Sequence, residues 1–229
     1  VLGANVGGDG DDDIVISDGG FVAYEHVDGY LESPVSVSTF SELLTGSEEI
    51  TQFGIATVAT AETEHEREDL LVRAYESSDD GRLVVYRFRG SHLSTPITAS
   101  ETFKFVGEPD DRREVSAYRG IASGDVNGDG LLDIVVGSPV VDDGATDTGR
   151  VYLWYGEEIP EPEVDLTEQV VIGLPGVGDS MVGSDVVVGD LNGDGFDDIV
   201  IGARGYDYED TTDGGAVFVV FGGGIEAAD

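Results

Sequence analysis

The stretch Gly124-Asp-Val-Asn-Gly-Asp-Gly-Leu-Leu-Asp133 leads directly into Ile134-Val-Val-Gly-Ser-Pro139. The first segment carries oxygen-bearing side chains at loop positions 1, 3, 5 and 9 and a glycine at position 6, namely Asp125, Asn127, Asp129, Asp133 and Gly130. Carboxylate and amide oxygens at this spacing let a short loop fold around one hard cation such as calcium. Glycine at position 6 permits the sharp turn that a Cβ would obstruct. The stretch therefore predicts a calcium-binding loop.

The residues after this loop predict a strand rather than a helix. Position 12 is Val136, whereas the calcium loop of a helix-loop-helix hand ends in a glutamate. The run Ile134–Val136 is β-branched and is stopped by Gly137-Ser-Pro139, which is typical of a buried strand. A simple Asn-Gly/Asp-Gly turn would explain Gly128 and Gly130, but it would not explain three carboxylates at positions 1, 5 and 9.

The same pattern recurs along the chain. Asp190-Leu-Asn-Gly-Asp-Gly-Phe-Asp-Asp198 repeats it 65 residues later, Asn5–Asp13 is a degraded copy, and Glu64–Asp69 is a faint one. The final aspartates of the four loops stand at positions 13, 69, 133 and 198, at steps of 56, 64 and 65 residues. A period of this size indicates one supersecondary unit repeated in tandem, each stacking its apolar face on the next.

Each unit contains short strands separated by turn signals, and helical periodicity is absent from the whole sequence. We therefore predict an all-β fold: a β-propeller of four-stranded antiparallel blades, with about four blades present. The blades are expected at about 1–50, 51–110, 111–176 and 177–229 of a single domain, residues 1–229. In the last two, strands are expected at Val115–Ser123, Ile134–Val136, Val151–Tyr155, Val164–Ile172, Val182–Val188, Ile199–Ile201 and Ala216–Phe221. No fourth strand is expected in the last unit.

Several segments resemble the FG-GAP repeat of integrin α-subunit β-propellers and their prokaryotic relatives. They are Phe53–Ala56, Gly120–Ala122, Asp125–Pro139, Gly183 with Asp190–Gly202, and the glycine-led strands Gly149–Leu153 and Gly215–Val219. The resemblance implies calcium in the loop between the first two strands of a blade and ligands on the opposite face. It also implies about seven blades. About four blades leave three alternatives open: a fragment, four blades that close alone, or two chains that complete one ring. Val1 stands late in a first strand, which favours a fragment or closure by the other terminus.

The resemblance assigns calcium ligands position by position. The two strong loops would use Asp125, Asn127, Asp129, Leu131 and Asp133, and Asp190, Asn192, Asp194, Phe196 and Asp198, with Leu131 and Phe196 contributing backbone oxygens. A candidate third site would use Asn5, Asp9, Asp11 and Asp13, with a backbone oxygen from Asp11, but Gly7 replaces its third-position side chain. The second unit has Ala61, Thr63 and His65 where ligands would fall, so no calcium is expected there.

Charge excludes some partners. The chain has 48 acidic and 11 basic residues, a net charge of −37, and Lys104 is the single lysine. Acidic surfaces almost free of lysine resemble those of proteins from extremely halophilic microbes, in which salt screens the self-repulsion. Nucleic acid and anionic membranes are poor partners because binding phosphate needs a basic patch. No apolar run approaches the roughly 18 residues that span a bilayer, so no direct membrane insertion is expected.

The leading functional hypothesis is a calcium-stabilised binding or adhesion module, extracellular or at the cell surface. Its partner would be a protein or glycan surface ligand. The ligand face is expected on the long acidic loops Val141–Gly149 and Gly205–Gly214, both taken as solvated, with Tyr206 and Tyr208 as aromatic contacts.

Two other classes stay open. One is an architectural subunit of a surface layer, filament or viral particle, which would bind further copies of itself or a sister subunit. The other is a polysaccharide-acting enzyme, since paired carboxylates abound. Catalysis is not expected, because His26, His65 and His92 stand in no known catalytic motif, and we assign no catalytic residue.

Overall fold

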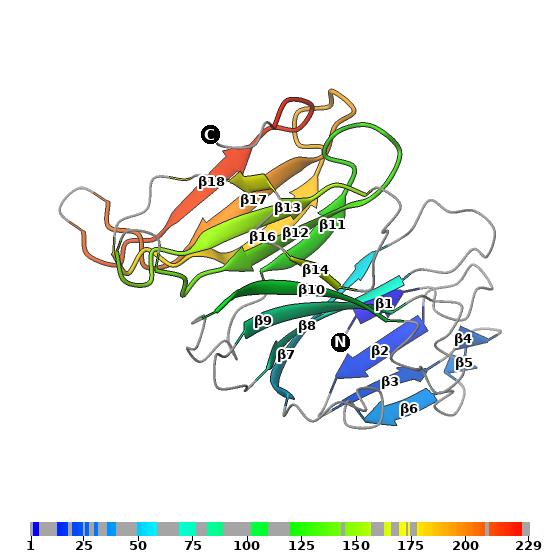
Figure 1. Ribbon diagram of the computed structural model, residues 1–229. Helices are drawn as coiled ribbons and strands as arrows, with labels where there is room; N and C mark the ends of the chain where they lie inside the picture. The colour runs from blue at the N-terminus through cyan, green and yellow to red at the C-terminus, as the bar shows by residue number, and fades with distance from the viewer. Residues whose placement is uncertain are drawn as a thin grey trace.

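The computed structural model describes residues 2–4, 13–17, 20–24, 26–27, 30–31, 36–39, 50–58, 69–76, 82–88, 102–109, 120–142, 145–156, 163–165, 170–172, 174, 178–208 and 211–225. Side chains are described in 120–142, 145–156, 172, 174, 178–208 and 211–225. All regular structure in these ranges is β-strand (Figure 1), as the sequence predicts. A search of the same ranges finds no helix that is long and apolar enough to cross a membrane.

The first two sheets come from the N-terminal half of the chain, except for one strand of the second sheet, β14. The first sheet has the order β1-β2-β3-β6, with strands Leu2–Ala4, Asp13–Ser17, Gly20–Tyr24 and Ser36–Thr39. A separate hairpin pairs β4 (His26–Val27) with β5 (Tyr30–Leu31). The second sheet has the order β14-β10-β9-β8-β7, with strands Glu163–Asp165, Thr102–Pro109, Arg82–Phe88, Asp69–Glu76 and Ile50–Val58.

The last two sheets carry the strong loops. The third sheet has the order β11-β12-β13-β15, with strands Ile121–Gly124, Asp133–Ser138, Arg150–Trp154 and Val170–Ile172. The fourth has the order β16-β17-β18, with strands Val182–Gly189, Asp198–Ala203 and Ala216–Val220. Neighbouring strands within these two sheets are antiparallel. Each strong loop joins the first and second strands of its sheet, which is where the sequence places it.

One expected strand is divided between two sheets. The sequence predicts a single strand over Val164–Ile172, but the structure has two, β14 and β15. β15 completes the third sheet against β13, whereas β14 pairs in parallel with β10 of the second sheet. The prediction was wrong because both pieces are only three residues long, and so short a pattern does not say which sheet edge a strand joins. The second sheet therefore has five strands.

Consecutive sheets pack against each other in chain order. β1 contacts β7, β7 contacts β11, and both β11 and β12 contact β16. The third sheet is covered on both faces, since every residue of β12 is buried. Its neighbour in the chain, the fourth sheet, supplies one of the covers.

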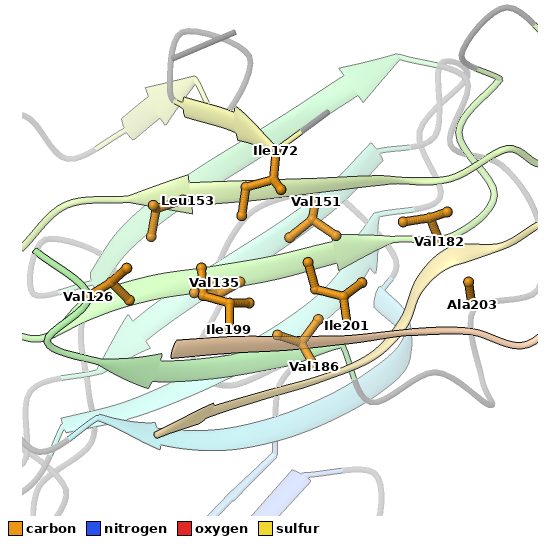
Figure 2. Close-up of a cluster of buried hydrophobic side chains, with 10 residues drawn as sticks. All are labelled: Val126, Val135, Val151, Leu153, Ile172, Val182, Val186, Ile199, Ile201 and Ala203. Atoms are coloured by element: carbon orange, nitrogen blue, oxygen red, sulfur yellow. The ribbon is translucent and has the colours of Figure 1, made fainter. Parts of the chain in front are cut away.

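The core between the third and fourth sheets is aliphatic (Figure 2). From the third sheet Val135, Val151 and Leu153 point into it, each 0% exposed. From the fourth sheet Ile199 and Ile201, also 0% exposed, face them. Val126, Ile172, Val182, Val186 and Ala203 complete the cluster, and Phe218 and Val220 of β18 pack against it. Burial of this many aliphatic side chains favours the contact by about 25 cal/mol per Å² of apolar surface.

Three glycines allow the backbones of these sheets to touch. A Cβ added at Gly137 would overlap the carbonyl oxygen of Gly183 and lie 2.8 Å from its Cα. A Cβ added at Gly120 would meet the same carbonyl oxygen. Gly183 also has φ +85°, which disfavours any other residue. Gly120 precedes β11, Gly137 lies within β12 and Gly183 lies within β16, and the structure brings these three glycines together across neighbouring sheets.

Candidate metal-binding loops

The first strong loop runs from Asp125 to Asp133 and joins β11 to β12. Gly128 and Gly130 have φ of 78° and 85°, a region that residues with a Cβ avoid. The backbone turns sharply at both points, and the amides between them point toward the start of the loop. The positions of these glycines are therefore set by the turn itself.

The carboxylate of Asp125 organises that turn. Its Oδ1 accepts hydrogen bonds from the backbone N–H groups of Gly128 (2.7 Å) and Asp129 (3.0 Å), and its Oδ2 accepts one from Gly130 (2.9 Å). The amide of Asn127 donates through Nδ2 to Asp129 Oδ2 at 2.9 Å. Asp129 Oδ1 in turn accepts the N–H of Leu131 at 2.8 Å. The three predicted side-chain ligands at positions 1, 3 and 5 thus gather inside one exposed loop.

Asp133 differs from the other acids because it is buried. It is 0% exposed, and its oxygens accept the N–H groups of Val126 and Gly156, each at 2.8 Å. Burial raises the pKa of this carboxyl, the two amide hydrogen bonds oppose the rise, and the negative charge of Asp129 adds to it. A cation beside the loop would favour the ionised form of Asp133.

The second strong loop, Asp190 to Asp198, repeats this arrangement. Asp190 Oδ1 accepts from Gly193 (2.6 Å) and Asp194 (3.2 Å), and Oδ2 accepts from Gly195 (3.1 Å). Asn192 Nδ2 donates to Asp194 Oδ2 at 2.9 Å. Asp198 is 0% exposed and accepts from Leu191 and Gly222, each at 3.0 Å. The recurrence of one hydrogen-bond pattern in two loops shows that the motif determines it.

The two loops also touch each other. The N–H of Asp125 donates to Asp197 Oδ2 at 2.9 Å, and the N–H of Asp197 donates to the carbonyl of Asp125 at 2.9 Å. The ring of Phe196 lies against Gly128, so a Cβ there would be 2.8 Å from Phe196 Cδ1. Sequence reasoning missed Asp197. The available signal is the doubled acid Asp197-Asp198, which the first strong loop lacks because Leu132 stands in the equivalent place.

The donor chemistry of both loops fits a hard cation. Each offers three carboxylates and an amide oxygen, the ligand types that calcium prefers. Among the described residues, however, acidic and histidine side chains do not converge, three or more together, on a point where they would hold a metal ion. Their oxygens are instead turned toward backbone amides of the loop. Each carboxylate oxygen has two lone pairs, so an amide contact leaves capacity for a cation on the open side of the loop.

The remaining predicted ligands are only partly placed. Asp13 begins β2 and pairs with Ala4 of β1. Asn5, Asp9 and Asp11 lie outside the described residues, as does the Thr60–Glu68 loop in which we expect no calcium. The backbone positions Leu131 and Phe196 lie in the strong loops, and the side chain of Leu131 is 37% exposed.

The two tyrosines of the expected ligand face differ in their surroundings. Tyr206 packs edge-on against Phe218, with ring centroids 5.4 Å apart and planes at 78°, and belongs to the rim of the core. Tyr208 is 62% exposed. Of the pair, Tyr208 is therefore the side chain available to a partner.

The expectation that Val141–Gly149 is a solvated loop holds for Asp142, Ala145 and Thr146, which are exposed, but was wrong for Val141 and Asp147–Gly149. Val141, Asp147 and Thr148 are buried, at 6%, 8% and 6% exposure. The carbonyls of Thr146, Asp147 and Thr148 accept the N–H groups of Asp179, Met181 and Val182. The acidic composition suggested solvent, but these carbonyls need donors, and the strand entering the fourth sheet supplies them.

Comparison with known proteins identifies the repeated unit. Residues 117–154 and 182–220 each match the FG-GAP repeat. These two segments contain the strong loops and most of the third and fourth sheets. FG-GAP repeats are β-propeller units, so the all-β chain is built from propeller blades.

Similar proteins include phospholipases and integrins. The chain is 39% identical over 108 residues to the phosphatidylinositol-glycan-specific phospholipase D of Bos taurus, which covers 44% of this chain and 13% of that protein. It is 30% identical over 149 residues to integrin alpha-PS2 of Drosophila melanogaster, covering 62% of this chain and 9% of the integrin. It is 33% identical over 136 residues to integrin alpha-5 of Xenopus laevis, covering 55% and 12%. The chain thus spans a small part of each relative's length.

Proposed function

We propose that the chain is a calcium-stabilised β-propeller module for binding or adhesion, extracellular or at the cell surface. The observation that carries the proposal is the repeated loop, in which three clustered side chains, exposed or half-buried, stand next to one buried carboxylate. The likeness to integrin α-subunits supports a role in adhesion or binding in general. The location at the cell surface and the binding of a ligand there are both part of the proposal.

Calcium would be held by the side chains of Asp125, Asn127, Asp129 and Asp133 in one loop and of Asp190, Asn192, Asp194 and Asp198 in the other. Bound there, it would supply the positive charge that three neighbouring carboxylates lack, and binding would therefore be coupled to folding. The chain's own contribution is the turn, which holds these oxygens close together through the amides of Gly128 and Gly130. In the proposal the metal stabilises the blade and takes no part in catalysis.

Thermal unfolding in molar KCl, with calcium titrated against a chelator, tests the metal. Extracellular calcium modules bind with Kd of about 0.1–1 mM. At 10 mM calcium each site would then add about 1.4–2.7 kcal/mol. Two sites would raise the Tm by an amount on the order of 10 °C.

A double variant distinguishes loss of calcium binding from loss of the turn. In Asp129→Asn/Asp194→Asn the side chain keeps an oxygen for the N–H of Leu131 or Phe196 but loses its charge. We expect the calcium-dependent rise in Tm to fall to less than half, with a similar Tm in chelator. Asp179→Asn/Asp213→Asn removes the same charge from two exposed turns and should retain the full response. A Tm that ignores calcium in the unmodified chain would refute the metal sites.

The acidic surface supports a second part of the proposal, folding in concentrated salt. A net charge of −37 opposes the compact state unless salt screens it. We propose that the protein comes from a halophilic source, and expect the Tm to rise steeply between 0.1 and about 3 M KCl. A salt-independent Tm would contradict this part alone.

Ligand binding is tested separately from stability. Beads coated with the chain would be exposed to arrays of glycans and of extracellular proteins, with calcium and with chelator. We expect calcium-dependent capture that Tyr208→Ala reduces, because this ring is exposed. Leu191→Ala changes an equally exposed apolar side chain outside that loop, at a position that is not a predicted calcium ligand, and is the matched control. We propose no catalytic role for this segment; turnover of a polysaccharide by the purified chain would refute that.

The second candidate is an architectural subunit whose ligand is another copy of the chain or a sister subunit. It is favoured by the apolar side chains exposed on the outer face of β18.

A further inference from the structure

The outer face of the fourth sheet is apolar and exposed. The side chains of Val187, Val217, Val219 and Phe221 are 60%, 69%, 45% and 59% exposed. Strand register aligns Val187 with Val200 and Val200 with Val219, so these positions lie side by side across the three strands. Apolar patches of this kind on a soluble protein mark sites of contact.

In the third sheet the equivalent apolar face is covered by a neighbouring sheet. When the two strong loops are aligned, Val135 takes the position of Val200. The strand register then places Leu153 at the position of Val219 and Val151 at that of Val217. In the third sheet Val135, Val151 and Leu153 are each 0% exposed. They are covered by the inner face of the fourth sheet, which presents Ile199 and Ile201 (Figure 2). The outer face of the fourth sheet has the same apolar side-chain pattern without that cover.

Glycines give independent support for the same conclusion. A Cβ at Gly124 would lie 3.1 Å from Asp197 Cγ, and one at Gly128 would strike the Phe196 ring, both on the fourth sheet. The equivalent glycines of the fourth sheet are Gly189 and Gly193. A Cβ at either would meet nothing within 4 Å. The fourth sheet thus keeps the small residues that close approach requires, while the approaching surface is absent.

The hydrogen bonds between the loops support the same conclusion. In the third sheet the N–H and carbonyl of Asp125 are both paired with Asp197 of the next sheet. Asp190 stands at the equivalent place in the fourth sheet, at the rim of the exposed face. The missing neighbour should therefore offer a carboxylate immediately before the first residue of its second strand, and isoleucines where Ile199 and Ile201 stand.

The first sheet of this chain has that sequence. Asp13 begins β2 as Asp198 begins β17, and Asp12 precedes it as Asp197 precedes Asp198. Ile14 and Ile16 occupy the positions of Ile199 and Ile201. The first sheet of the same chain does not cover the fourth, because the outer face of the fourth is exposed.

We propose that the outer face of the fourth sheet binds the first sheet of a second copy of the chain, head to tail. Such a contact is heterologous, so it closes into a ring or continues as a filament. Two copies with four sheets each would close into eight, within the range of about 4–8 blades that propellers use. Asp185 at the edge of the face and the net charge of −37 make association dependent on salt. The inference rests on packing and does not need calcium.

Sedimentation of the 229-residue chain in about 3 M KCl, across roughly 1–100 µM protein, tests the contact. We expect reversible dimers that weaken at 0.2 M KCl. Val217→Asp places a carboxylate on the exposed apolar face and should weaken association at least about tenfold. Thr212→Asp adds the same charge at an exposed turn and should leave association unchanged. A monomer at every concentration and salt, or equal effects of the two variants, would overturn the proposal.

Cross-linking identifies the surface that docks. The chain has no cysteine of its own, so Val217→Cys and Val22→Cys introduce single thiols. Val22 pairs with Ile16 as Phe218 pairs with Ile201, which places it in the predicted partner surface. Mixing the two variants with a short bis-maleimide should give the 217–22 product. A product joining only 217 to 217 would show two fourth sheets face to face and would overturn the head-to-tail arrangement.

Discussion

The contact between Gly137 and Gly183 offers a sharp test of how neighbouring sheets meet. In Gly137→Ala the new methyl group would overlap the carbonyl oxygen of Gly183 and lie 2.8 Å from its Cα and its carbonyl carbon. All three atoms belong to backbone, so no side-chain rotation relieves the overlap. The strand β12 or the start of β16 must move, and both are packed against the buried aliphatic core.

The magnitude follows from two opposing terms. Overpacking of a filled interior costs about 1–3 kcal/mol, and the upper end applies here because backbone meets backbone. Replacing glycine with alanine also removes freedom from the unfolded chain, which stabilises by about 0.4–1 kcal/mol. The net expectation is a loss of about 2 kcal/mol. For a chain of 229 residues this corresponds to a fall in Tm of about 4–8 °C.

Urea and thermal unfolding followed by circular dichroism, in molar KCl, would measure the change. Gly224→Ala is the matched control, since a Cβ there meets nothing within 4 Å and the residue has no positive φ. That variant should be neutral or stabilised by up to about 1 kcal/mol. Equal stability of the two variants would refute the conclusion that close approach of the two backbones requires glycine at these positions.

Two further predictions concern contacts that tie the sheets together. Asp197→Ala removes the acceptor of the Asp125 N–H and should lower the free energy of unfolding, measured in urea, by about 1 kcal/mol. Asp197→Asn keeps an oxygen and should recover most of the lost stability. Equal stability of the two variants would contradict the role of this hydrogen bond. Tyr155 donates its hydroxyl to the carbonyl of Ile225 at 2.8 Å, and burial, with the charge of Asp133, raises its pKa above 10.0. Because the unfolded chain ionises this phenol first, stability should fall as pH rises from 10 through the higher folded pKa. Tyr155→Phe should show a shallower loss of Tm over that range, and identical slopes would exclude the effect.

The loops could be predicted from sequence because their interactions are local. Every amide that the carboxylate of Asp125 binds lies within five residues of it, so the spacing of the motif is enough to specify the turn. The same holds for the second loop. Strands beside the loops follow from β-branched runs such as Ile199–Ile201, which the structure places in β17 with Ile199 and Ile201 in the core.

The contacts between units could not be predicted in the same way. Asp197 reaches Asp125 across 72 positions of sequence, and its residue type alone suggests only a solvated acid. Tyr206 is of a residue type that often contacts partners, but in the structure its ring packs against Phe218. The acidic composition around Thr148 suggested solvent, whereas pairing with the segment that enters the fourth sheet buries Asp147 and Thr148. In each case the deciding partner comes from another part of the chain.

The division of Val164–Ile172 between two sheets has a consequence for how the chain can be rearranged by duplication or deletion. β14 lies between β13 and β15 in sequence, yet it is hydrogen-bonded to β10 of the preceding sheet. A gene segment that encodes the third sheet from β11 to β15 also carries the edge strand of the second. Excising it would leave β10 with an unpaired edge, which is a template for aggregation. No boundary between β10 and β15 keeps both pairings, so the second and third sheets could be duplicated or deleted only together, with the boundary after β15.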